Sequence, residues 1–309
     1  MTIPPLVNEW WSWTPQNGPE ISLAQPWLTI STFGGSRFGL PTLRGSDYEV
    51  AFRAGMQHRQ KYPNSRTVSL VMAVSGTDPD TGLPATDDQI LAWNNNFQYI
   101  RQAMWTRDPL GSVQGMLTRR WYLTQPGQPP AVVAATATGE LGGSMDPAMT
   151  GRTRADFTTD VVLADPYFYG AAQSVTIAAG ATAVLAPLGE GIVGEGYASQ
   201  VNSFTCLLNG PLTTPTVRNA IAGPNGVQFT YLGTVAPGEV VTVDFLAFTA
   251  TSSLGPNVAG QVKHAGARFW FCLVPSPDPA LPAANPVSLT TLNAVDNGTA
   301  TLQWNDCYV

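Results

Sequence analysis

The clearest candidate for cofactor chemistry is the segment from Gly189 to Gly194, GEGIVG, which matches the G-x-G-x-x-G pattern of dinucleotide-binding turns. That pattern binds a pyrophosphate only where it joins a strand to the N-terminus of a helix. The flanking residues predict no such helix, and Glu190 and Glu195 would repel a pyrophosphate. We therefore interpret the segment as a glycine-rich loop and expect no cofactor.

Metal-binding patterns are equally incomplete. The segment Asp78 to Gly82, DPDTG, resembles the start of a calcium loop, but Gln89 stands where the closing glutamate is needed. A turn leading into a helix is the better interpretation. The two histidines, His58 and His264, do not lie near a cysteine at ligand spacing, so we expect no zinc site.

Signatures of nucleophilic and metal-dependent hydrolysis are missing from the sequence, which has no G-x-S-x-G, H-E-x-x-H or P-loop pattern. We expect a protein that is not an enzyme, without catalytic, cofactor-binding or metal-binding residues. A glycosidase would need only a carboxylate pair, and the 21 acidic residues leave that alternative open. The three cysteines, Cys206, Cys272 and Cys307, lie in or beside apolar runs, which favours buried free thiols over a disulfide without fixing their redox state.

Aromatic residues cluster at Trp10, Trp11 and Trp13 and at the pair Trp121 and Tyr122. Such clusters can stack on sugar rings, but aromatic residues are also enriched in cores and subunit interfaces. We favour a core or interface role and keep sugar binding as the alternative.

The elements that position these residues are mostly strands. Aromatic residues alternate with proline and glycine in the first 45 residues, as in short strands joined by turns. Turns are predicted at Asn225-Gly226 and, with type II geometry, at Pro237-Gly238. Runs rich in apolar and β-branched residues predict strands over residues 66–74, 116–124, 131–138, 155–164, 228–232, 240–248, 267–274 and 300–304.

A single helix is predicted near residues 87–107. Thr86 is the expected N-cap, and Asp108-Pro109 ends the pattern. Five apolar residues recur at steps of three and four and are expected on one face, which would lie against a sheet or a neighbouring chain: Ile90, Trp93, Phe97, Ile100 and Met104.

Composition divides the chain in two. Residues 1–170 carry 12 basic and 14 acidic groups, whereas residues 171–309 carry 3 and 7, in a chain with only 12% charged residues and a net charge of -6. We therefore predict a domain boundary after Gly170. The sequence has no basic patch, which argues against sequence-specific nucleic-acid binding. It also shows no secretory signal and no apolar run long enough for membrane insertion, so we expect a soluble protein made in a cytoplasm.

Several short motifs, taken in order, resemble a known family. In the first domain they are Trp13-Thr14-Pro15, Arg66 to Leu70, Arg107 to Leu110, Arg119-Arg120-Trp121 and, most specifically, Ala164 to Gly170, ADPYFYG. In the second domain they are Asn209-Gly210, Pro215 to Asn219, Gly238 to Phe245, Arg268-Phe269-Trp270 and Trp304. On these motifs the chain resembles the distal tail proteins of siphophages, especially the minor tail proteins of actinobacteriophages.

The resemblance implies a mainly β fold. Residues 1–170 would form a belt domain, a tail-tube-like split β-barrel or sandwich with one α-helix, and six copies would close into a ring. Residues 171–309 would form a peripheral galectin-like, or jelly-roll, β-sandwich.

The resemblance also implies a structural role at the tail tip of a virion assembled in the host cytoplasm. The partners would be the tail tube protein, the tail-tip hub protein and the tape measure protein, with the tape measure and DNA passing through the ring. Two alternatives stay open: a baseplate carbohydrate-binding or receptor-binding protein whose sandwich binds a host glycan, and a cell-wall hydrolase.

Overall fold

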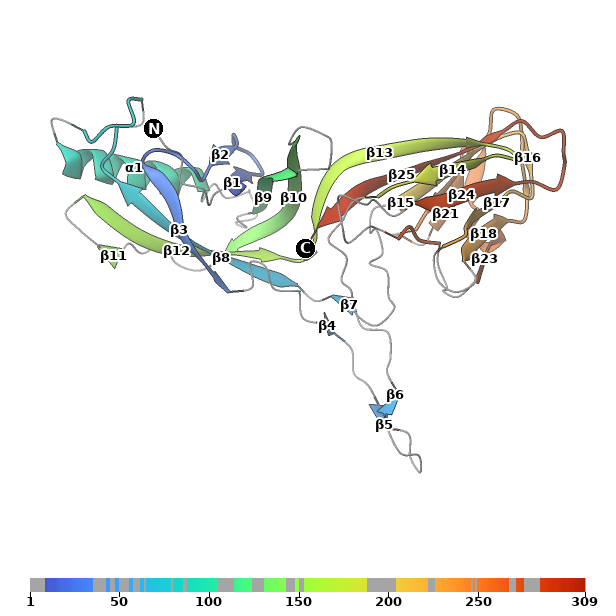
Figure 1. Cartoon of the computed structure of the whole chain (residues 1–309), viewed down its shortest axis with the longest axis horizontal. Helices are drawn as coiled ribbons and strands as arrows, with labels where there is room; N and C mark the ends of the chain where they lie inside the picture. Colours follow the sequence, from blue (N-terminus) through green and yellow to red (C-terminus); the bar gives the residue numbers. More distant parts are fainter. Residues whose placement is uncertain are drawn as a thin grey trace. The chain divides into compact units, whose positions relative to one another are not determined.

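The structure is a computed structural model, and two compact units divide the chain between Phe168 and Tyr169. This boundary lies two residues before the one predicted from the sequence, after Gly170. These residues lie in a strand, β13 (Phe168–Ala178), rather than in a linker. The predicted mainly β fold with one helix is confirmed, since α1 is the one α-helix among the described residues (Figure 1). Those residues are 9–35, 43–44, 48–49, 56–57, 62–63, 65–78, 80–85, 88–104, 114–123, 131–142, 148–149, 153–187, 204–221, 226–245, 247, 249–266, 271–274 and 284–308.

The first unit contains two groups of antiparallel strands that meet where Glu140 of one group pairs with Val162 of the other. One group has the order β2 (Ile21–Ser22), β1 (Glu9–Pro15), β9 (Gln114–Leu123) and β10 (Ala131–Gly142). The other has the order β3 (Leu28–Gly35), β8 (Arg66–Ser75), β12 (Arg154–Leu163) and β11 (Ala148–Met149). Two further short pairs join β4 (Leu43–Arg44) to β7 (Tyr62–Pro63) and β5 (Tyr48–Glu49) to β6 (Met56–Gln57).

Alternation along the strands builds the core of the first unit. Every second residue of β12 is buried, as expected for strands with one face toward a core. On β1, Trp11 and Trp13 are buried, so the core interpretation is right for these two tryptophans. The core also contains Leu70, Met72, Leu117, Ala135, Phe157, Val161 and Leu163.

The helix α1 (Gln89–Met104) begins after Asp88. The Asp88 carboxylate accepts hydrogen bonds from the backbone N–H groups of Ile90, at 3.0 Å, and Leu91, at 3.1 Å, which is the geometry of an N-cap. The prediction that Thr86 caps the helix was therefore wrong by two residues. Residues 86–87, and the predicted end of the helix at 105–107, lie outside the described residues.

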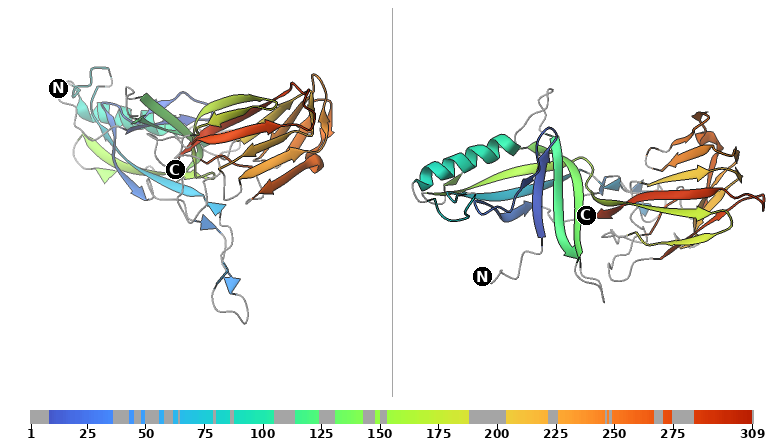
Figure 2. Two further views of the ribbon diagram at one scale, coloured as in Figure 1. Left: turned by 45° about the vertical axis from the view of Figure 1, so that its right-hand side comes forward. Right: turned by 90° about the horizontal axis from the view of Figure 1, so that it is seen from above.

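The helix α1 packs against β8 and β1, and its buried residues lie in its second half (Figures 1 and 2). Phe97 is 4% exposed and meets Phe157 of β12 edge-on, with ring centroids 5.6 Å apart. The buried Asn96 donates hydrogen bonds to the backbone carbonyls of Ser75 and Thr77, just where β8 ends. This polar anchor had no counterpart in the sequence analysis.

The sheet covers only part of the predicted apolar face of the helix. Phe97, Ile100 and Met104 are buried as expected, and Trp93 is half-buried. Ile90 is 58% exposed, although it lies on the same side as Phe97, seven residues later. The first turn of α1 is therefore not covered by the sheet.

The second unit is a sandwich of two antiparallel sheets around one core (Figure 2). We call them the β15 sheet and the β17 sheet. The β15 sheet has the order β13, β25 (Thr299–Tyr308), β15 (Phe204–Asn209), β20 (Val240–Asp244), β21 (Thr249–Ser252) and β22 (Gly255–Asn257). The β17 sheet has the order β14 (Thr182–Leu185), β24 (Asn285–Thr290), β17 (Thr216–Asn219), β18 (Val227–Tyr231) and β23 (Val262–Gly266). The unit also contains the pair β16 (Leu212–Thr213) and β19 (Thr234–Val235) and the short helix η1 (Ala259–Gln261).

Four phenylalanines are in contact with one another at the centre of this core. The rings of Phe204 and Phe245 stack with centroids 4.8 Å apart, and Phe229 meets Phe245 and Phe271 edge-on at 5.2 and 5.5 Å. Such pairs stabilise a core beyond the area that they bury.

Two predicted strands of the second unit need correction. The run 240–248 is interrupted, because β20 ends at Asp244, whose carboxylate accepts a hydrogen bond from the N–H of Ala247 at 2.8 Å. Of the predicted strand 267–274, the described part, residues 271–274, is not in a sheet.

The turn at Pro237-Gly238 is confirmed: Gly238 has φ +79, and the N–H of Glu239 donates to the carbonyl of Ala236.

Candidate assembly surfaces

The outward side of β1, β9 and β10 carries exposed apolar residues on regular strands. We define the strand face as Trp10, Met116, Tyr122 and Val132. Because Trp10 pairs with Arg120 and Val132 pairs with Tyr122, these side chains point away from the buried Trp11 and Leu117. Met116, Tyr122 and Val132 are 45%, 48% and 50% exposed, and Trp10 is half-buried with its ring 5.5 Å from that of Tyr122. Trp10, Tyr122 and Val132 are neighbours, whereas Met116 lies further along β9, beyond Arg120 and Thr118. Exposed apolar residues that adjoin one another can mark a contact surface.

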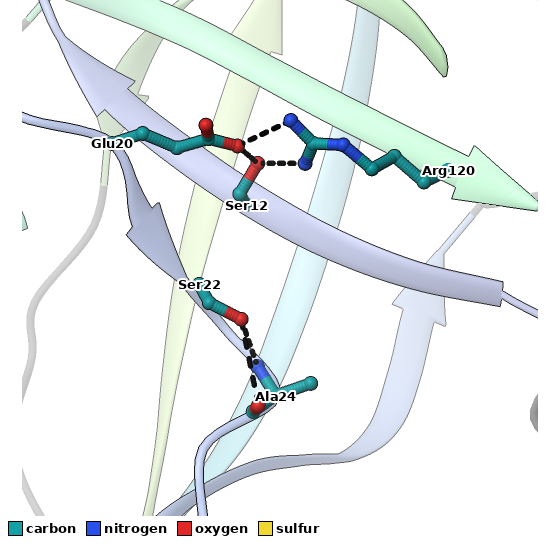
Figure 3. Close-up of polar contacts among 5 residues, drawn as sticks. All are labelled: Ser12, Glu20, Ser22, Ala24 and Arg120. Atoms are coloured by element: carbon teal, nitrogen blue, oxygen red, sulfur yellow. Dashed lines mark hydrogen bonds and ion pairs between the residues drawn. The ribbon is translucent and has the colours of Figure 1, made fainter. Parts of the chain in front are cut away.

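A polar cluster lies on the same side of β1 and β9, between Met116 and Tyr122, and ties the two strands together. Figure 3 shows the Ser12 hydroxyl between Glu20 and Arg120: it donates to the Glu20 carboxylate and accepts from Nη1 of Arg120 at 2.7 Å. Nη2 of Arg120 lies 2.6 Å from the same carboxylate. These contacts, led by the Ser12 hydrogen bond, lower the pKa of Glu20 from its ordinary value despite an opposing effect of burial.

This cluster is suited to holding strands together rather than to catalysis. A serine nucleophile needs a base that removes its proton and an open path to a substrate. Here an arginine donates to the Ser12 oxygen, and the residue is only 1% exposed. Nearby, Ser22 forms a local turn in which the N–H of Ala24 donates to its hydroxyl at 3.3 Å (Figure 3).

A second ionic contact faces the interior of the first unit. Nε of Arg119 lies 3.1 Å from the Glu9 carboxylate, and the guanidinium lies 4.7 Å from the ring centroid of Trp121. The side chains of Arg119 and Glu9 are 9% and 15% exposed, so solvent screens this pair less than a surface pair.

Of the aromatic residues proposed as a sugar platform, only Trp10, Trp121 and Tyr122 remain accessible.

The uncovered start of the helix forms another apolar surface. We define it as Leu83, Ile90 and Leu91, which are 64%, 58% and 54% exposed. Leu83 belongs to the turn predicted at Asp78, where the Asp78 carboxylate accepts hydrogen bonds from the N–H groups of Asp80 and Thr81. The turn interpretation of that segment is confirmed.

The predicted candidates for chemistry do not come together in the described part of the chain. No group of three or more His, Cys, Asp or Glu residues that could hold a metal ion occurs there. Burial raises the pKa of Cys206 and lowers that of His264, whose ring lies 6.3 Å from those of Phe229 and Phe245. Cys272 is buried, as is Cys206. Residues 189–194, His58 and the side chain of Cys307 lie outside the described residues.

No described helix has the length and hydropathy needed to cross a membrane. The fold is that of a two-unit β protein whose first unit has exposed apolar side chains on its strands and at the start of its helix. No protein-family model matches the sequence, and no curated protein matches it.

Solved structures do resemble the chain. It is similar to the Dit protein (gp 19.1) of phage SPP1, with a TM-score of 0.53 and 11% sequence identity, over 96% of this chain and 98% of that one. That protein is described as a paradigm of the hub adsorption apparatus in phages that infect Gram-positive bacteria. Chains of the activated phage P2 baseplate, with Ca and with Sr, align over 96% and 95% of this chain and 98% and 97% of theirs, with identities of 9% and 10% and TM-scores of 0.35 and 0.34.

The likeness to the SPP1 protein extends through both units. At 11% identity it is a likeness of fold. The chain therefore has the fold of a phage Dit protein, as its sequence motifs predicted.

Proposed function

We propose that this chain is a structural protein of a bacteriophage tail, a distal tail protein that acts through the surfaces it offers to copies of itself and to neighbouring virion proteins. The observation that carries the proposal is the shared fold with the SPP1 Dit protein over 96% of the chain. A local match would leave the second unit unexplained, whereas this one includes both units.

In this proposal the first unit forms a ring. A head-to-tail contact between identical copies repeats until the copies close into a ring. Exposed apolar surface favours such a contact because the contact buries it. The strand face and the helix start supply such surface on two different sets of elements. A heterologous contact needs two different patches on each copy, which these surfaces provide. We propose a homohexamer.

The ring would join the tail tube to the tail-tip hub of a siphovirus and leave a channel for the tape measure protein and DNA. The net charge of -6 supports a passive channel, because binding to a DNA backbone needs positive side chains that neutralise its phosphates. The second unit would be a peripheral, galectin-like domain. We propose no enzymatic role for either unit.

Labelling of virions tests the proposed role. Antibodies raised against the chain should bind the end of the tail opposite the capsid in micrographs of the phage that encodes it. Labelling of the capsid, or no labelling of particles that contain the chain by mass spectrometry after gentle disruption, would contradict a position at the tail tip.

A further inference from the structure

The charged residues of the second unit are separated between its two sheets. The strands of the β17 sheet contain Arg218 and Lys263 and no Asp or Glu. The strands of the β15 sheet contain Asp244 and Asp306 and no Lys or Arg. A unit that is acidic as a whole therefore has one sheet with only positive charge.

Both positive side chains lie on the outer side of the β17 sheet. On β17 and β18, Val217 and Phe229 are buried in the core, so Arg218 and its neighbours in register point outward. We define the cationic face as Thr216, Arg218, Gln228, Thr230, Lys263 and Ser288. Arg218 and Lys263 are exposed, and neither forms an ion pair with a residue in the described part of the chain.

Hydroxyl and amide groups fill the space around the two cations. Arg218 pairs in register with Gln228 on one side and Ser288 on the other, and Thr230 pairs with Lys263. The hydroxyls of Thr216 and Thr230 are hydrogen-bonded at 2.8 Å. Because β17 and β23 are separated by one strand, their backbones lie about 10 Å apart. The face thus offers two separated positive charges with neutral donors and acceptors between them.

We propose that the cationic face binds an anionic polymer of polyol units joined by phosphodiesters. Arg218 and Lys263 would pair with phosphates, and the hydroxyl and amide side chains would bond to the polyol. This inference depends only on the second unit and not on the proposed ring.

The composition of the face favours such a polymer over a protein or a nucleic acid. Protein interface centres are enriched in aromatic residues and depleted in lysine and serine, whereas the cationic face has no aromatic residue. Single-stranded nucleic acids are bound by stacking on aromatic rings, which the face also lacks. Lys263 lies on the edge strand β23, where a lysine also discourages pairing between sheets, but Arg218 lies on a strand paired on both sides and needs another explanation.

Titration of the full chain with synthetic poly(glycerol phosphate) tests the proposal. Binding should weaken with salt, with a slope of log K against log salt of about -1.4, because each phosphate neutralised along a single strand contributes about -0.7. Arg218→Gln and Lys263→Gln should each weaken binding by up to about fivefold and make the slope shallower, while Arg218→Lys should retain most of the affinity. The control Arg101→Gln/Arg154→Gln removes two exposed cations from the first unit and should bind like the wild type.

Three results would overturn the proposal. The first is an absence of binding by the wild-type chain at low salt. The second is an equal loss of binding in the control, which would show attraction to overall charge. The third is equally tight binding of a DNA oligonucleotide with the same number of phosphates, which would show that the polyol is not recognised. Unchanged circular dichroism and melting of each variant should accompany these measurements.

Discussion

The two units expose their apolar side chains in different places. In the first unit they lie on the surfaces of regular elements, such as Tyr122 and Val132 on neighbouring strands. In the second unit the three most exposed ones, Leu254, Leu292 and Val295, lie in turns between strands, and Val184 is exposed on β14 without an exposed large apolar neighbour in register. A flat set of residues on adjacent strands can form an extended contact, whereas single residues on separate turns are common on any protein surface. This difference supports the proposal that the first unit carries the assembly contacts.

The units also differ in how they satisfy buried polar groups. The first uses ionic contacts, such as Arg119 with Glu9. The second uses two fully buried amides. The side chain of Asn219 donates to the side-chain oxygen of Asn285 at 2.9 Å. The side chain of Asn285 in turn accepts a hydrogen bond from the N–H of Val274 and donates one to its carbonyl oxygen. In the second unit the hydrogen bond from Ser252 also lowers the pKa of the Glu239 carboxyl, so we expect both units to lose stability in acid.

The largest effect is expected for Phe229→Ala in the second core. The side chain is fully buried among Phe245 and Phe271, so its removal should cost about 3–5 kcal/mol of unfolding free energy. Chemical denaturation measures this loss. The control Val184→Ala, at a position 65% exposed, should change stability by less than about 0.5 kcal/mol. Equal effects of the two variants would contradict the position of the core.

A smaller loss is expected for Asn285→Ala. It would leave buried backbone groups of Leu185 and Val274 without their partner, at a cost of about 1–3 kcal/mol. Hydrogen exchange should show faster exchange at the N–H of Val274 before global unfolding. Unchanged exchange there would mean that the amide does not hold residues 271–274.

The strand face should govern association without governing folding. Tyr122→Ser/Val132→Ser removes two half-exposed apolar side chains, so the melting of the monomer should change little while self-association weakens at least tenfold. Val184→Ser makes the same kind of change on β14 of the second unit and should associate normally. Sedimentation velocity over a range of concentrations distinguishes them. Equal weakening of self-association in both variants would contradict the proposal that the first unit, rather than the second, carries the assembly contacts.

The smallest effect concerns Glu20 and pH. Because its pKa is lowered in the folded state, its contribution is fully present above the ordinary value of 4.5 and is lost as pH falls through the lowered value. The side chain is 46% exposed, so we expect less than about 1 kcal/mol. Glu20→Gln should lower stability at neutral pH and flatten its acid dependence in this range. A variant as stable as the wild type at pH 7 would show that the cluster contributes nothing.

Sequence patterns predicted an element correctly where a single local requirement determines its structure. The apolar and β-branched run at 155–164 predicted β12, and the Pro-Gly pair predicted the turn before β20, because a glycine at φ +79 is what that turn requires. Residues 271–274 were mistaken for a strand because they are apolar and buried like one. Their backbone bonds instead to the side chains of Asn219 and Asn285, which are distant in sequence.

The candidate surfaces were harder to predict from sequence. Periodicity placed Ile90 and Phe97 on one side of the helix, but it could not show that the sheet stops short of the first turn. Likewise, the alternation in β9 marks two faces without showing which is buried. That choice follows from pairing with β1 and β10, which only the folded chain reveals.

The native mass of the purified chain tests the central claim most directly. Light scattering and native mass spectrometry should find about 197 kDa, six times the 32.8 kDa of one chain, and micrographs should show rings. The Tyr122→Ser/Val132→Ser variant should shift this mass toward that of the monomer. A wild-type chain that stays at 32.8 kDa at every concentration, with no rings, would contradict the account.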